Sequence, residues 1–87
     1  MAHSFKQCIL FFKSTTEHVT GTEILKKLSD VFDIDSSDVQ VSEYSVEIRF
    51  VTAEAHDDML ERCNNIKGSI DSANHERLFY KITIMSL

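Results

Sequence analysis

The spacing of hydrophobic residues changes along the chain, and each change predicts a new element. Residues 5–13 are rich in aromatic and branched side chains, and every residue from Cys8 to Phe12 is apolar. A short run that is apolar in both alternation phases is typical of a strand covered on both faces. The pattern therefore predicts a central strand at 5–13, followed by a polar loop at 14–19.

A helical spacing begins after this loop. Thr20-Gly21-Thr22-Glu23 reads as a capping box, in which the threonine hydroxyl accepts a hydrogen bond from the amide three residues on. The apolar residues that follow fall on one helical stripe, at Ile24, Leu25, Leu28, Val31 and Phe32. We expect a helix of about three turns, ended by the polar run 33–38.

Residues 39–51 alternate between apolar and polar, but the apolar phase changes within the run. Val39 and Val41 are odd, whereas the later apolar positions are even: Tyr44, Val46, Ile48 and Phe50. Since a regular strand keeps one phase, the run is either two strands joined by a tight turn at 42–45 or one strand with a bulge. The hairpin is favoured, although its loop lacks the usual glycine, asparagine or aspartate.

The last third of the chain predicts a helix and a closing strand. Thr52 is placed to cap a helix and Gly68 to end it in the left-handed conformation, with a stripe of Ala55, Met59, Leu60, Cys63 and Ile66. Residues 69–74 then form a polar connection. The strand at 77–87 places Leu78, Tyr80, Ile82 and Ile84 on its inward face.

The predicted element order is strand, helix, strand, strand, helix, strand, within a single domain at 1–87. This is the order of the ferredoxin-like split β-α-β-β-α-β fold, an α+β class. Right-handed crossovers then place the first and third strands in the middle of a four-stranded antiparallel sheet, with both helices on one face.

Charge is unevenly distributed along the sequence. The net charge is −5, yet residues 28–61 hold ten acidic residues against Arg49 alone, and the rest of the chain is net positive. In the predicted topology, two connections within this segment meet at one edge of the sheet. They bring together a set of six carboxylates that we take as the partner-binding site: Asp33, Asp35, Asp38, Glu54, Asp57 and Asp58.

The usual signatures of chemistry are missing from the sequence. The histidines have no zinc-ligand spacing, and Gly21 and Gly68 do not form a phosphate-binding loop. The run from Asp33 begins like a calcium loop, but Asp38 and Tyr44 stand where that loop needs glycine and glutamate. We therefore expect no catalytic residues, no metal and no cofactor.

Two further features bear on location and partners. Cys8 and Cys63 are too few for a secreted disulfide scaffold, and the first residues do not resemble a signal peptide, so we expect a cytoplasmic protein. Residues 46–52 resemble the third strand of an RNA recognition motif only in one aromatic residue, and the acidic total opposes direct contact with nucleic acid.

The sequence favours a small, acidic, non-enzymatic module that binds and inhibits or modulates a larger protein with a basic surface, such as one that binds nucleic acid. Phage-encoded inhibitors of host defence complexes, including anti-CRISPR proteins, have this general character, although no motif identifies this chain as one. The uncovered sheet face is a second candidate contact and would support a homodimer; its residues are Phe79, Met85, Glu47 and Arg49. The alternative is a small metal-dependent hydrolase or nuclease that uses the edge carboxylates.

Overall fold

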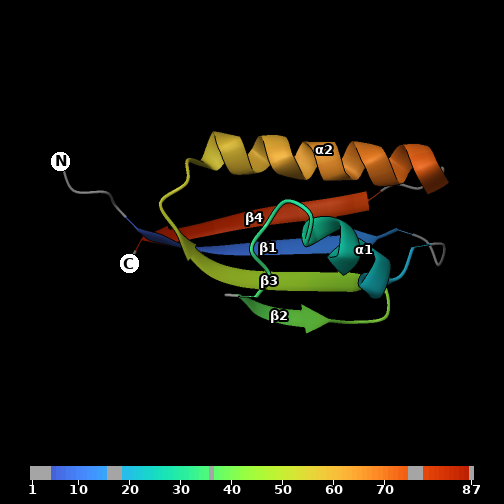
Figure 1. The fold of residues 1–87 in the computed structure, drawn as a ribbon, viewed down its shortest axis with the longest axis horizontal. Coiled ribbons are helices and arrows are strands. Elements are labelled where there is room, and N and C mark those ends of the chain that lie inside the picture. Colours follow the sequence, from blue (N-terminus) through green and yellow to red (C-terminus); the bar gives the residue numbers. More distant parts are fainter. Residues whose placement is uncertain (1–4, 16–18, 36, 75–77, 87) are drawn as a thin grey trace.

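A computed structural model of the chain describes residues 5–15, 19–35, 37–74 and 78–86. The elements follow the order β1 (Lys6–Ser14), α1 (Gly21–Leu28), β2 (Asp38–Val41), β3 (Ser45–Thr52), α2 (His56–Asn74) and β4 (Leu78–Ser86). The strands form one sheet in the order β2-β3-β1-β4, with every neighbouring pair antiparallel. Figure 1 shows this α+β arrangement, in which β1 and β3 occupy the predicted central positions.

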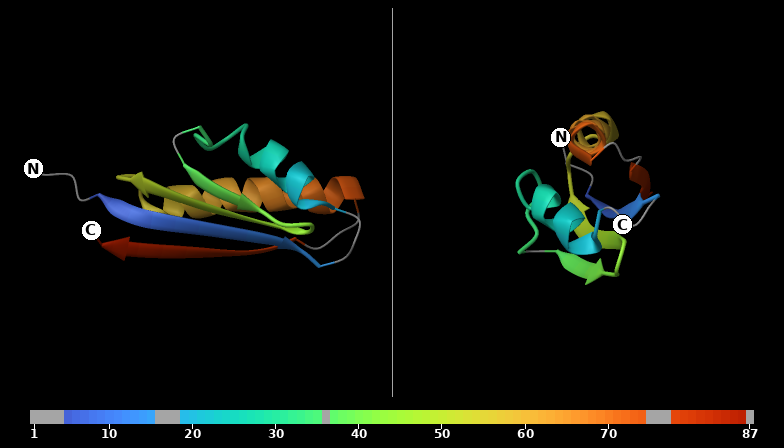
Figure 2. Two further views of the ribbon diagram at one scale, coloured as in Figure 1. Left: turned by 90° about the horizontal axis from the view of Figure 1, so that it is seen from below. Right: turned by 90° about the vertical axis from the view of Figure 1, so that its right-hand side faces the viewer.

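The even-numbered side chains of β1, β3 and β4 face the helices and form the core. Both helices lie over this same face of the sheet (Figure 2). The fully buried strand residues are Cys8, Leu10, Phe12, Val46, Ile48 and Leu78, and the helices add Ile24, Leu28, Met59, Cys63, Ile66 and Ile70. The odd-numbered residues point to the opposite side, on which no described helix packs; we call this side the open face.

The phase change at 42–45 is a hairpin turn, as favoured from the sequence. Ser42 N donates to Ser45 O at 2.8 Å and closes a loop between β2 and β3. Two carbonyls of the same loop accept from other parts of the chain, because Ser14 N donates to Tyr44 O and Gly21 N donates to Glu43 O. These contacts hold a loop whose own residues are poor turn formers.

Gly21 is required by the close approach of this hairpin to the start of α1. A Cβ atom at Gly21 would lie 2.1 Å from Ser42 O and 2.6 Å from Ser45 O, so no other residue fits without moving backbone. The preceding Thr20 caps the helix as predicted, since its Oγ1 accepts from Glu23 N at 3.2 Å. The capping sequence therefore fixes both the start of the helix and its contact with the hairpin.

The first helix is shorter than the sequence predicted. It ends at Leu28, where Ser29 Oγ donates to Lys26 O and so competes with the helical backbone. The chain continues in hydrogen-bonded turns, with Phe32 N donating to Leu28 O at 2.9 Å. Phe32 is buried as expected, whereas Val31, placed on the same stripe, is exposed.

The second helix differs from the prediction at both ends. Thr52 is the last residue of β3, and its Oγ1 accepts from Glu54 N, while the helix begins at His56 after an exposed Ala55. Gly68 does not end the helix, which continues to Asn74 because Ile70 is buried and extends the apolar stripe. The segment 69–74, predicted as a connection, is therefore helical.

The two cysteines are free and fully buried on the helix-covered side of the sheet. Cys8 Sγ donates to Met59 Sδ at 3.4 Å. Burial raises the pKa of Cys8 to about 11 and that of Cys63 to about 12, and the negative charge of Glu54 adds to both increases. Among the described helices, neither combines the length and the apolar character needed to cross a membrane.

The two glycines predict opposite responses to the same substitution. Gly68 lies inside α2 with no atom within 4 Å of a built Cβ, so Gly68→Ala should raise the free energy of unfolding by about 0.5–1 kcal/mol. Gly21→Ala should lower it by about 2 kcal/mol or more, because the methyl group meets two hairpin carbonyls. Urea denaturation of both variants measures this difference, and equal effects would contradict the close approach at Gly21.

The thiol pKa values predict that stability falls at alkaline pH. Above about pH 9 the unfolded chain releases thiol protons that the folded chain retains, so the free energy of unfolding should decrease by at most about 1.4 kcal/mol per pH unit for each thiol. The decrease should level off near the folded pKa values of about 11 and about 12. Urea denaturation across this pH range measures the decrease. If a double variant with Cys8→Ala and Cys63→Ala lost stability with pH as steeply as the wild-type chain, the effect would belong to other groups.

Candidate functional site

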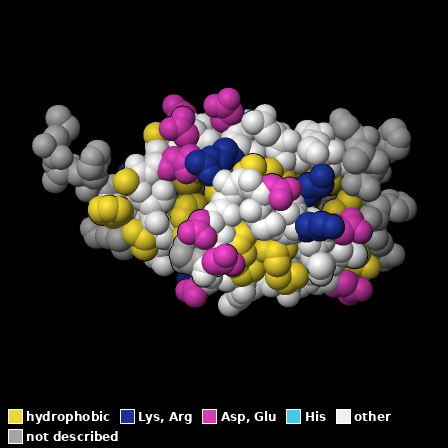
Figure 3. Space-filling view, viewed as in Figure 1, with side chains coloured by type: hydrophobic (Ala, Val, Ile, Leu, Met, Phe, Trp, Pro, Cys, Tyr) yellow, Lys and Arg dark blue, Asp and Glu magenta, His cyan; other side chains and the backbone are white. Residues whose placement is uncertain are grey.

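The six predicted carboxylates lie on or directly beside two connections that approach one end of the molecule. Asp33 and Asp35 are in the α1–β2 connection and Asp38 begins β2, whereas Glu54 precedes α2 and Asp57 and Asp58 form its first turn. Every member except the half-buried Glu54 is exposed. We call these six residues the acidic surface. Figure 3 shows acidic side chains gathered near the start of α2 and beside the α1–β2 connection.

The structure brings Asp33 and Glu54 into one pocket. The pocket has a volume of about 230 Å³ and is lined by Phe32, Asp33, Phe50, Val51, Thr52, Glu54 and Arg62. This juxtaposition joins the two connections across the end of β3, as the predicted topology required. The volume is below the roughly 300–1,000 Å³ of typical small-molecule sites.

Arg62 is the residue of this site that sequence reasoning missed. Its Nη2 lies 2.6 Å from Glu54 Oε1, its Nη1 donates to Val31 O at 2.5 Å, and its guanidinium lies 5.2 Å from the centroid of the Phe32 ring. Arg62 therefore holds the α1–β2 connection against α2 and partly compensates the charge of Glu54. Its position directly before Cys63 on the helix gave no sequence signal, since an arginine there is typical of a solvated helix surface.

The remaining carboxylates are placed separately around this pocket. Asp38 lies opposite Arg49 in the β2–β3 register and lines a different hollow, together with Gln7, Arg49, Phe50 and Val51. Asp57 Oδ1 is 3.7 Å from His56 Nδ1, and its side chain is almost fully exposed. Asp57 and Asp58 also interact favourably with the positive end of the α2 dipole. The acidic surface is thus a set of separated carboxylates around Glu54, whose charge is partly compensated by Arg62.

The arrangement offers exposed negative charge beside an apolar wall. Within the described residues, no three histidine, cysteine, aspartate or glutamate side chains are grouped so that they could hold a metal ion. The exposed carboxylates accept hydrogen bonds and attract cationic side chains, while Phe32 and Phe50, whose ring centroids are 6.0 Å apart, give the pocket an apolar wall.

The residues predicted for the sheet-face contact all lie on the open face. Glu47 Oε2 is 3.5 Å from Arg49 Nε near the middle of β3. Phe79 and Met85 lie on β4 opposite Lys13 and Gln7 of β1, so they mark the two ends of the strand. The structure therefore places an ion pair in the interior of the open face and exposed apolar side chains at its β4 border.

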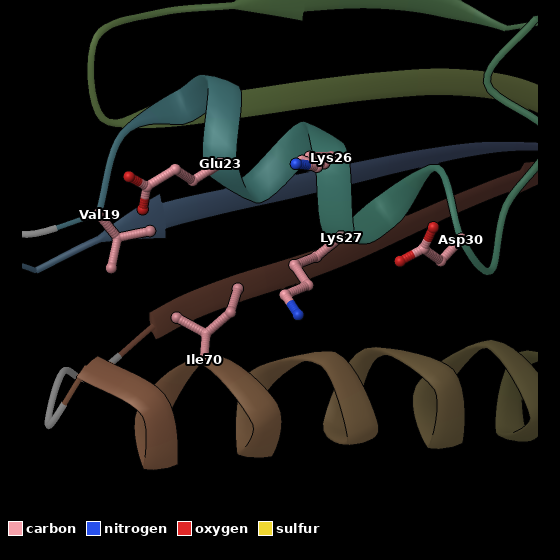
Figure 4. A pocket seen from close by; sticks show the side chains of 6 residues that line it. All are labelled: Val19, Glu23, Lys26, Lys27, Asp30 and Ile70. Carbon is pink, nitrogen blue, oxygen red and sulfur yellow. The ribbon is translucent and has the colours of Figure 1, made fainter.

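A further hollow separates the two helices. It has a volume of about 280 Å³ and is lined by Val19, Glu23, Lys26, Lys27, Asp30 and Ile70. Figure 4 shows Ile70 of α2 and Val19 on one side of the space and the charged side chains of α1 and Asp30 around it. Two lysines and two carboxylates line this hollow, so its lining carries no net charge.

Comparisons of the chain with protein-family models, curated proteins and solved structures found no match.

The contacts of Arg62 predict a larger structural role than those of the other described arginine, Arg49. Arg62→Ala should lower the free energy of unfolding by about 1–2 kcal/mol, because it removes an ion pair, a backbone hydrogen bond and a cation–π contact. Arg49→Ala is the matched control, and its longer, exposed pair should cost less than about 0.5 kcal/mol. Thermal or urea denaturation compares the two, and equal losses would contradict the role assigned to Arg62.

Proposed function

We propose that the chain is a non-enzymatic protein-binding module that modulates or inhibits a larger protein with a basic surface, such as a nucleic-acid-binding component of a host defence complex. The observation that carries this proposal is the convergence of the α1–β2 connection, which carries Asp33 and Asp35, with the start of α2, which carries Asp57 and Asp58. All four side chains are exposed. We also infer that the fold is the ferredoxin-like one, because its strand order and antiparallel pairings are those expected of a split β-α-β arrangement.

Electrostatics supports a role for the acidic surface in raising the rate of association with a basic partner. Clustered carboxylates attract a basic partner over about 10 Å at moderate salt and accelerate encounter with it. The pocket beside them adds an apolar wall for one inserted side chain, which supplies short-range fit. The module would occupy the surface with which its partner binds an anionic ligand.

A pair of charge-matched variants tests the proposal. The first neutralises four aspartates of the acidic surface, at positions 33, 35, 57 and 58, to asparagine. The second neutralises four exposed acids outside it: Glu23→Gln, Asp30→Asn, Glu43→Gln and Glu61→Gln. Because each variant loses four negative charges, a difference in binding between them depends on where those charges lie and not on the net charge.

The expected result is that only the first variant loses binding. Stoichiometric partners captured from the native host by the wild-type chain should associate with the first variant about tenfold more slowly or worse, and wild-type association should slow as salt is raised. Equal binding by both variants would refute the acidic surface. A rise in melting temperature on adding magnesium or manganese would instead favour a metal-dependent enzyme.

A further inference from the structure

Strand β4 forms a long edge of the sheet. It runs for nine residues, and among the described strands β1 is its only neighbour. The opposite edge, β2, is only four residues long and begins with the exposed Asp38. Short strands and charges are the usual means of preventing a sheet edge from pairing with another chain. The β2 edge has both of these features, whereas β4 has one charged residue, Lys81, and no acid.

Helix α2 covers the face of β4 and leaves its outer edge open. Tyr80 Oη donates to Asn64 Oδ1 at 2.5 Å, and Leu78 N donates to Asp71 Oδ1 at 2.9 Å. The first contact lies on the helix-covered face, whereas the second involves only the N–H at the start of the strand; the end view in Figure 2 shows α2 above β4 and not beyond it. Because the N–H of Leu78 already donates to Asp71, residues 79–85 are the segment available for pairing with another strand.

The available segment is symmetric about Ile82. Phe79 and Met85 are the large apolar residues of β4 that are most exposed, at 52% and 41%, and each lies three positions from Ile82. A two-fold axis at Ile82 therefore places Phe79 of one copy directly opposite Met85 of the other. It also places Tyr80 opposite Ile84 on the helix-covered face, so each apolar side chain meets another apolar side chain.

The same register avoids repulsion. Lys81 of one copy lies opposite Thr83 of the other copy and not opposite Lys81. A shift of one residue would turn every side chain of one copy to the wrong face, so such a shift is disfavoured.

We propose that two copies of this chain associate through antiparallel pairing of their β4 edges, centred on Ile82, to form one continuous eight-stranded sheet. The occupant of the edge is a second copy because the side chains of β4 complement themselves about that centre. This association uses residues outside the acidic surface, so it does not depend on the proposed partner.

Opposite charges introduced at Thr83 test the register. Thr83→Lys places two lysine pairs across the axis, whereas Thr83→Glu places two lysine–glutamate pairs there. In sedimentation velocity, the wild-type chain should show a monomer–dimer equilibrium that shifts with concentration. Thr83→Lys should weaken the dimer about threefold or more, and Thr83→Glu should strengthen it by a similar factor.

Glu47→Lys is the matched control, because Glu47 lies on the open face but two strands away from the β4 edge. It should leave the dissociation constant unchanged. A chain that stays monomeric at all concentrations would overturn the proposal. A dimer that responds to Glu47→Lys and not to either change at Thr83 would also overturn it, because that result describes packing between two open faces.

Single cysteines supply a test that does not depend on the folding of the Thr83 variants. Phe79→Cys and Met85→Cys should form a disulfide-linked dimer when the two proteins are mixed, and neither should do so alone. In the proposed register, identical positions are about 20 Å apart, too far for a disulfide. Cys8 and Cys63 are buried and should not compete. Cross-linking of either variant with itself, or none on mixing, would refute the register.

Discussion

The contact between the β2–β3 hairpin and the start of α1 is the constraint on which the rest of the structure depends. The hairpin loop closes through Ser42 and Ser45, while its other carbonyls accept from the amides of Ser14 and Gly21. One short loop thereby fixes the end of β1, the start of α1 and the register of β2 on β3. Only glycine tolerates the approach. The position of α1, and of the acidic connection that follows it, is set by this contact.

Arg62 provides the corresponding restraint at the other end of the molecule. It joins α2 to the α1–β2 connection through Glu54, the carbonyl of Val31 and the ring of Phe32. It therefore ties together the two segments that carry the exposed acids. This positively charged residue therefore helps to fix the relative positions of the acidic side chains around it, although it reduces the negative charge of the surface.

Local signals in the sequence predicted those features that depend on neighbouring residues. The cap at Thr20, the phase change before Val46 and the inward positions of β4 follow from spacing alone. Gly68 was predicted to end α2, but glycine only permits the left-handed conformation and does not impose it. The helix continues because Ile70 is buried. The role of Arg62 could not be predicted, because all its partners except Glu54 lie about thirty residues away along the chain.

The two edges of the sheet differ in a way that separates the two proposed associations. The β2 side is short and lies near the acidic connections, so it repels another copy of the same acidic chain; the partner proposed for this side is basic. The β4 side is long, almost uncharged and symmetric about Ile82, so it favours a second copy. A dimer through β4 leaves the acidic surface of each copy outside the paired edge, so it would carry two acidic surfaces. Such a dimer could engage two basic sites at once, with an increase in apparent affinity that needs no new contact.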